Sequence, residues 1–209
     1  MNRLAAITAA ALMLAAAGCS SDDDTAASPG TSVTAAPPSS SAAAGGDEQA
    51  WLDPHAHVEA ILAGVDTNDV VDVGRAIAEI ACTWSPVIDS TETASLLRAS
   101  PLLTPEYAAT LVEPARGASQ AIFIQAAAAK AVSTPSAQQR TDIVDGPPST
   151  DTTQYLAYAV TWQWTTTDQQ PADIDDPRIR TVYVVLQKQP GGAWLASSVD
   201  YHDQQKAGE

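Results

Sequence analysis

The sequence predicts an α+β fold in which a layer of helices packs on an antiparallel sheet. Residues 70–84 carry apolar side chains at the spacing of one helix face. Residues 154–166 instead alternate between two faces, as a strand does. Helical segments come first and a run of strands follows, an order that is typical of a helix layer covering one side of an antiparallel sheet.

Residues 1–18 are expected to be a lipoprotein signal peptide. Arg3 precedes an apolar run, 4–17, that is shorter than the roughly 20 apolar residues a helix needs to cross a bilayer. The run ends in Ala16-Ala17-Gly18-Cys19, which resembles a bacterial lipobox. The resemblance implies cleavage before Cys19 and a diacylglycerol group on its sulfur. An ordinary secretory signal followed by a chance cysteine is the alternative.

Residues 19–50 are expected to be a lipidated, disordered tether. They are rich in Ser, Thr, Ala, Pro, Gly and Asp, and Val33 is their one large aliphatic residue. Such a segment cannot bury enough apolar surface to offset its chain entropy. We expect one folded domain over 51–205, held by the lipid on Cys19 at the extracytoplasmic face of the cell membrane.

Caps and prolines predict three short helices, over 55–63, 91–98 and 105–112. Before the first of them, Asp53 offers an N-cap oxygen and Pro54 a first-turn proline, while Gly64 is a C-cap signal. The Thr104-Pro105-Glu106 sequence starts the last one in the same manner. These signals indicate that the helical half of the domain is built from short pieces around one longer helix.

The longer helix is predicted over 70–84. Its apolar stripe consists of Val70, Val73, Ile77, Ile80, Ala81 and Trp84. Gly74 lies inside it, at a cost of about 1 kcal/mol relative to alanine, so we expect close packing against another backbone there. Arg75 and Glu79 are four residues apart and are expected to pair on the exposed side.

The strand half is predicted to begin with 121–133. This segment is rich in alanine and fits a helix on propensity alone, but its place before a hairpin region favours a strand. In 154–166, one face carries Leu156, Tyr158, Val160, Trp162 and Trp164. Two more strands, 178–189 and 193–202, flank a Pro-Gly-Gly turn. The acidic loop 168–177 is expected to be exposed and mobile.

This order of elements resembles the nuclear-transport-factor-2-like superfamily, also called SnoaL-like. The segment Arg98-Ala99-Ser100-Pro101-Leu102-Leu103-Thr104-Pro105-Glu106-Tyr107-Ala108, after a helix ending in Trp84, is similar to envelope proteins of actinobacteria. Their relatives are extracytoplasmic scaffold subunits of type IV secretion and conjugative transfer systems. The resemblance implies a cone-like bent antiparallel sheet packed by two to three N-terminal helices. It also implies a non-enzymatic interaction or assembly module.

The charge of the chain limits its partners. Ten basic residues stand against 25 acidic ones, for a net charge of −15. Nucleic-acid binding needs a basic face that displaces counterions from phosphates, and anionic membrane surfaces disfavour an acidic protein for the same reason. The expected partners are therefore the membrane, through the lipid anchor, and an envelope protein, with no nucleic acid.

The sequence contains no common nucleotide-binding, zinc-protease or serine-hydrolase motif. We therefore expect no catalytic, cofactor-binding or metal site, and Cys19, as the lipidation site, is the one functional residue predicted. His55 and His57 are two apart on a helix, about 200° from each other, so they are poorly placed to share a metal. Cys82 is expected to be a small buried residue rather than a redox thiol.

The alternative function is a small-molecule-binding protein or an isomerase- or dehydratase-like enzyme that uses the cone cavity. Enzymes of the resembled superfamily carry an acid or a histidine on the concave face, and the alternation places Asp200 and His202 together with Trp194, Ala196 and Ser198. A solvated strand edge explains the same pair. Either a cavity or a packed core fits the aromatic residues Tyr158, Trp162, Trp164, Tyr183 and Trp194.

Overall fold

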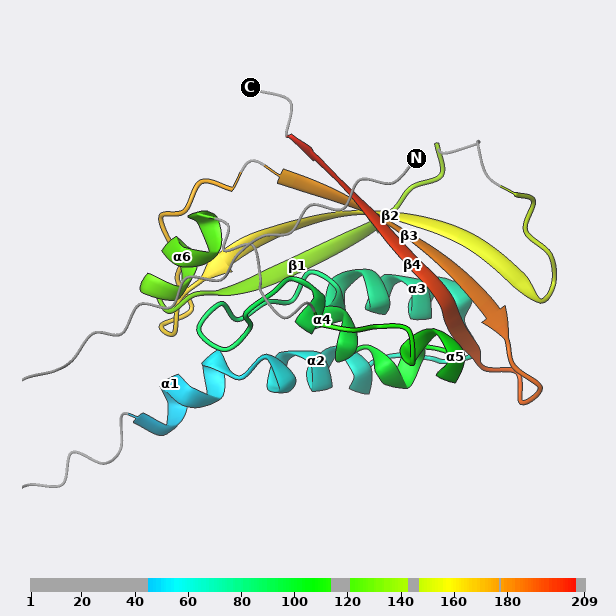
Figure 1. The fold of residues 1–209 in the computed structure, drawn as a ribbon, viewed down its shortest axis with the longest axis horizontal. Coiled ribbons are helices and arrows are strands. Elements are labelled where there is room, and N and C mark those ends of the chain that lie inside the picture. The colour runs from blue at the N-terminus through cyan, green and yellow to red at the C-terminus, as the bar shows by residue number, and fades with distance from the viewer. Residues whose placement is uncertain (1–44, 114–120, 143–146, 177, 206–209) are drawn as a thin grey trace, which may run out of the picture. The chain divides into compact units, whose positions relative to one another are not determined.

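The structure confirms the α+β class. The computed structural model describes residues 45–113, 121–142, 147–176 and 178–205, all in the second of two compact units, 41–209. In this part of the chain, short helices precede an open antiparallel sheet of four strands in the order β1-β2-β3-β4 (Figure 1). None of the described helices is long and apolar enough to cross a membrane.

The helices are α1 (Gly45–Leu52), α2 (Pro54–Ala63), α3 (Val70–Ile80), α4 (Thr93–Leu97), the 3-10 turn η1 (Ser100–Leu102), α5 (Pro105–Ala108) and α6 (Ala121–Ala128). The strands are β1 (Val132–Gln139), β2 (Thr153–Thr165), β3 (Arg178–Lys188) and β4 (Trp194–Gln205). Helix α1 starts before Trp51, where order was expected to begin. It is docked through Trp51, whose Nε1 donates to the Thr165 carbonyl oxygen at 3.3 Å, and through the buried Leu52.

Helix α3 lies across one face of the sheet, here called the inner face, and contacts all four strands (Figure 1). Its predicted stripe is confirmed, since Val73, Ile77 and Trp84 are fully buried. The helix ends at Ile80 rather than at Trp84. The chain turns there because β1 offers new bonds: Trp84 N donates to Ser133 Oγ at 2.6 Å, and Ser133 N donates to Trp84 O at 2.9 Å.

The predicted strand 121–133 is wrong. The alanine-rich part forms helix α6, as its helix propensity favours, and Lys130, with φ of 51°, follows the helix. Strand β1 comes only afterwards and pairs antiparallel with β2. Pro135 fits inside β1 because this is an edge strand, where a missing N–H costs no ladder bond.

Strand β4 contains an irregularity that the sequence alternation did not reveal. Val185 lies opposite Ser198, whereas its neighbour Leu186 lies opposite Ala196. Ser197 is therefore an extra residue on β4, as in a β-bulge. The extra residue shifts the alternation of the strand by one. Even-numbered residues before the bulge therefore point to one face of the sheet, and even-numbered residues after it point to the other.

Candidate functional site

The one predicted acid–base candidate lies outside the covered side of the sheet. Because of the bulge, Trp194 and Ala196 are buried on the inner face, at 6% and 0% exposure. Asp200 and His202 are exposed on the outer face, opposite Tyr183 and Thr181 of β3. The expected grouping of Asp200 and His202 with Trp194, Ala196 and Ser198 on one face is wrong, because Trp194 and Ala196 lie on the other face, and the pair faces away from the helices.

The two histidines at the start of α2 serve local structure. The backbone N–H of His55 donates to the capping carboxylate of Asp53 at 2.9 Å. The His57 ring lies edge-on to Trp51, with centroids 4.8 Å apart, and its Nε2 is 2.7 Å from the Trp51 carbonyl oxygen. Among the described residues, no three His, Cys, Asp or Glu side chains are grouped so that they could hold a metal ion.

The inner face is filled by aromatic side chains. Trp84 packs against Trp162 at a centroid distance of 5.1 Å and against Trp164 at 6.3 Å, while Phe123 of α6 closes the cluster. Tyr158 is also buried, at 1% exposure, but Tyr183 is 40% exposed on the outer face. Four of the five aromatic residues predicted for a core or cavity therefore lie in the core.

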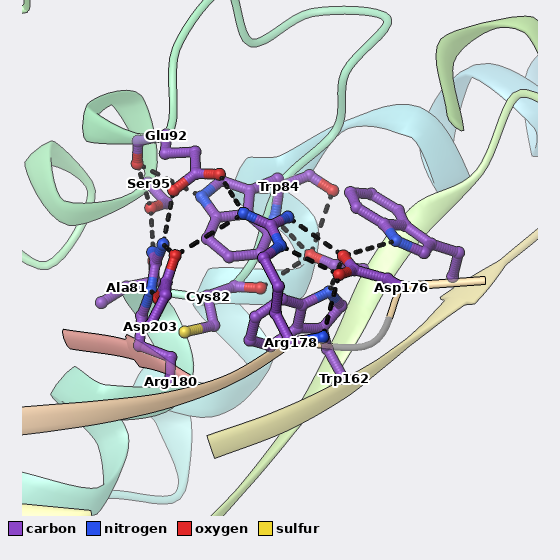
Figure 2. A network of polar contacts seen from close by, with 12 residues as sticks. Ala81, Cys82, Trp84, Glu92, Ser95, Trp162, Asp176, Arg178, Arg180 and Asp203 are labelled. Atoms are coloured by element: carbon purple, nitrogen blue, oxygen red, sulfur yellow. Dashed lines mark hydrogen bonds and ion pairs between the residues drawn. The ribbon is translucent and has the colours of Figure 1, made fainter. Parts of the chain in front are cut away.

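A network of arginines and carboxylates lies beside this aromatic cluster, and Figure 2 shows it from close by. Arg180 is 1% exposed, yet it carries a full charge. Its Nε and Nη2 donate to both carboxylate oxygens of Asp203 at 2.6 and 2.8 Å, and Nη2 also donates to Glu92. The fork of the guanidinium thus joins strand β4 to the segment before α4.

Arg178 makes a second fork two residues earlier on the same strand. Its Nε and Nη2 donate to the carboxylate of Asp176 at 2.9 and 3.0 Å, and its Nη1 donates to Glu92 at 3.0 Å. Glu92 is consequently shared by Arg178 and Arg180. Two cations and three carboxylates form one connected group, in which each charge lies beside an opposite one.

The aromatic cluster and the charged network are in contact. The Arg180 guanidinium carbon lies 4.3 Å from the centre of the Tyr201 ring and 5.1 Å from that of Trp84. The Arg178 guanidinium carbon is 5.3 Å from the Trp162 ring. These distances are within the range of cation–π attraction, which strengthens when the cation is withdrawn from water.

Asp176 closes the network from the loop after β2. It is buried, at 6% exposure, and accepts hydrogen bonds from Trp162 Nε1 at 2.9 Å and from Trp164 Nε1 at 3.4 Å. Burial alone would raise the pKa of this carboxyl group, but the hydrogen bonds and charge of Arg178 outweigh it and lower the pKa. The expectation that the loop is exposed throughout is therefore wrong at Asp176.

Cys82 is a free, fully buried thiol next to the network. Burial raises its pKa to about 12, although the nearby charge of Arg180 acts in the opposite direction. The thiol is therefore protonated at neutral pH and is a poor nucleophile. This placement agrees with the prediction of a small buried residue.

Two charged residues of α3, Arg75 and Glu79, have partners other than those expected. Arg75 pairs with Asp72 instead of Glu79. Glu79 turns toward β1, where its Oε1 accepts from Ala137 N at 3.4 Å, and partial burial raises its pKa. The predicted pairing across four residues is wrong because the strand backbone competes for the Glu79 carboxylate.

The network of Arg178, Arg180, Glu92, Asp176 and Asp203, here called the arginine–carboxylate clamp, is a fixed set of paired charges. Its guanidinium groups remain charged, because the neighbouring carboxylates raise their pKa values despite burial, and the two arginines lower the pKa values of Asp176 and Asp203 and hold these carboxylates ionised. A general acid or base needs a pKa near the working pH, whereas the pKa values of Asp176, Asp203, Arg178 and Arg180 are all shifted away from neutral pH. One sequence signal could have located the clamp. Arg178 and Arg180 are spaced two residues apart in line with the buried Val182, so they lie on the same face of the strand.

In comparisons with known proteins, the chain matches no protein-family model, no curated protein and no solved structure.

Proposed function

We propose that the chain is a lipid-anchored protein of the cell envelope whose folded domain is a non-enzymatic interaction or assembly module. In this proposal Cys19 carries the lipid on the extracytoplasmic side, and residues up to 44 link it to the domain. The cone-like curvature of the sheet and a place in a secretion or transfer complex belong to the same proposal, as the family resemblance implies. Cys19 lies outside the residues that the structure describes.

One observation supports this function most. The inner face of the sheet, where an enzyme of the resembled superfamily would bind its substrate, is filled by tryptophans and by the arginine–carboxylate clamp. Substrate binding there would require breaking ion pairs whose partners would be left buried without compensation. A packed interior of this kind suits a rigid body that presents its surface to a partner.

The anchor is tested at the cysteine itself. Replacing Cys19→Ala should abolish incorporation of labelled fatty acid and leave residues 1–18 attached, because the lipid is expected on this sulfur. Mass spectrometry of the purified protein measures both changes. The matched control is Cys82→Ala, which should retain the label, since Cys82 is the only other cysteine in the sequence. Fatty acid remaining on the Cys19→Ala protein would contradict the anchor.

The absence of acid–base catalysis is tested at Asp200 and His202. Changing both to alanine should leave the melting temperature within about 2 °C, because neither side chain is buried. The double variant should also restore the phenotype of a deletion strain as well as the parent protein does. Photo-crosslinking in intact cells should give the same protein adducts for both chains. A folded double variant that fails to restore the strain would favour the enzyme alternative.

A further inference from the structure

The loop between α3 and α4 exposes two adjacent aliphatic side chains. Val87 and Ile88 are 48% and 50% exposed, although a short polar loop would serve equally well to connect two helices. Scattered exposed aliphatics are ordinary on protein surfaces. These two, however, lie on a tightly braced turn at the side of a hollow.

The brace is a buried ion pair beneath the turn. Arg98 donates through Nη1 and Nη2 to both oxygens of Asp89, at 2.7 and 2.9 Å, and their side chains are only 8% and 3% exposed. The other Asp89 contacts close the turn, since its Oδ2 accepts from Ser85 N at 2.8 Å. Arg98 also donates to the Thr83 carbonyl oxygen at 2.9 Å. The backbone that carries Ile88 is therefore braced before any partner arrives, which lowers the entropy cost of binding.

The hollow beside the turn, here called the α4 groove, has a volume of about 520 Å³. Its apolar wall consists of Ile88, Ala94, Leu97 and Pro101. Its polar rim includes His55 and Glu113. The groove is large enough to admit one or two apolar side chains, and the exposed Ile88 would be covered by them.

Among the described residues that line the α4 groove, the net charge is negative. Arg98 is neutralised by Asp89, which leaves Glu113 as a carboxylate on the rim, and Asp53 caps the helix that begins beside His55. Glu113 accepts hydrogen bonds from Ser90 and Thr91 but forms no ion pair with any residue in the described ranges. In these ranges every arginine is already paired with a carboxylate.

We propose that the α4 groove binds a segment of a partner protein that places an apolar side chain beside Ile88 and a lysine or arginine against Glu113. The proposal rests on the interaction-module function and names the surface and the chemistry of its partner. Apolar contact supplies the affinity, and the cation provides selection, since a like-charged segment would be repelled. An anionic membrane surface fits less well because it carries the same charge as the rim.

A defined peptide tests this surface directly. The probe is an amphipathic helical peptide of about 14 residues built from Leu and Lys, with a Leu/Glu peptide of the same pattern as its counterpart. Binding to the full mature chain is measured by fluorescence anisotropy. The Leu/Lys peptide should bind, and Ile88→Ser should weaken it about tenfold. Glu113→Gln should weaken it about threefold and reduce its dependence on salt.

The matched control is Val71→Ser, which removes another exposed aliphatic side chain, 38% exposed on α3 and away from the groove. It should leave the affinity unchanged. Equal effects of Ile88→Ser and Val71→Ser would overturn the proposal, as would equal binding of the two peptides or no binding of either. Ile88-dependent binding to phosphatidylcholine vesicles in place of the peptide would assign the surface to the membrane instead. Thermal melts of each variant exclude unfolding as the cause.

Crosslinking separates failure of the groove from failure of the proposed function. A photoreactive residue is placed at Ser90, on the α4 groove, or at Gln163, on the outer face of the sheet. Adducts from Ser90 that a groove-binding peptide competes away support the proposal. Adducts from Gln163 alone would keep the interaction-module function and reject the groove. Adducts from neither position would count against both.

Discussion

Replacing Arg180→Ala is expected to destabilise the domain by about 3–5 kcal/mol, the cost typical of removing one partner from a buried charge pair. The guanidinium is 1% exposed and donates to Asp203 and Glu92. Without it, the Glu92 carboxylate is bonded, within the described ranges, only to Arg178, and Asp203 keeps only the 3.6 Å contact with Arg178. The stacking on Tyr201 is also lost. Urea unfolding followed by tryptophan fluorescence measures the change, because Trp84 and Trp162 lie beside the site.

The matched control is Arg75→Ala. Arg75 also pairs with an aspartate, Asp72, but its side chain is 52% exposed. Exposed pairs contribute about 0–1 kcal/mol, so this variant should be nearly as stable as the parent. Equal losses in Arg75→Ala and Arg180→Ala would mean that the inner network does not stabilise the fold beyond an ordinary surface pair.

The pH dependence of stability provides a second readout of the same variant. Burial alone would raise the pKa of Asp203, but hydrogen bonds and charge from Arg180 outweigh it and lower the pKa below its ordinary 3.8. As the pH falls below this value, the unfolded chain takes up the proton first, and the free energy of unfolding decreases. In Arg180→Ala the pKa of Asp203 should rise, so this acid-dependent loss should shrink. An unchanged acid dependence would contradict the assignment of Arg180 as the cause.

The elements that could be predicted from sequence carry their own periodicity. The apolar stripe of α3 and the apolar face of β2 are buried in the core as expected. The direction of each side chain there depends only on the regular geometry of its own element. In contrast, the phase of β4 depends on its partner strand, since the bulge at Ser197 appears only as a mismatch with β3. Helix α6 escapes the sequence prediction for another reason: its place before a hairpin region suggests a strand, whereas its alanine content determines the structure that forms.

The charged clamp could not be assembled from sequence for a different reason. Its carboxylates come from three distant segments, at Glu92, Asp176 and Asp203, and each one alone reads as a solvated acid. The free-energy cost of burying an arginine is offset only when carboxylates from such separate segments lie next to it. Charge patterns within a segment therefore do not predict that Arg178 and Arg180 pair with carboxylates on the inner face.

Replacing Gly74→Ala in helix α3 is expected to destabilise the domain by about 1–3 kcal/mol, the range typical of overpacking a core. At most helix positions the same change stabilises, by about 1 kcal/mol, because alanine has the higher helix propensity. Here the added Cβ would lie 2.6 Å from Tyr158 Oη and 2.9 Å from its Cε2. The close neighbour is this side chain, rather than the second backbone that the sequence suggested.

Tyr158 has little freedom to move away. It is 1% exposed, and its hydroxyl donates to the Val71 carbonyl oxygen of α3 at 2.8 Å. Displacing the ring would therefore break this hydrogen bond as well as disturb the core, so the sign of the substitution is reversed relative to an ordinary helix. Thermal and urea unfolding of the Gly74→Ala protein measure the loss.

Two comparisons separate the clash from a general effect of alanine. Gly64→Ala, where the new Cβ would meet only Ile61 O at 3.6 Å, should be neutral or slightly stabilising. In a Tyr158→Leu background, which removes the contacting atoms, Gly74→Ala should cost less than it does in the parent, and the difference is the coupling energy of the pair. If Gly74→Ala costs as much in the Tyr158→Leu background as in the parent, then the contact with Tyr158 is not the reason that α3 requires glycine at this position.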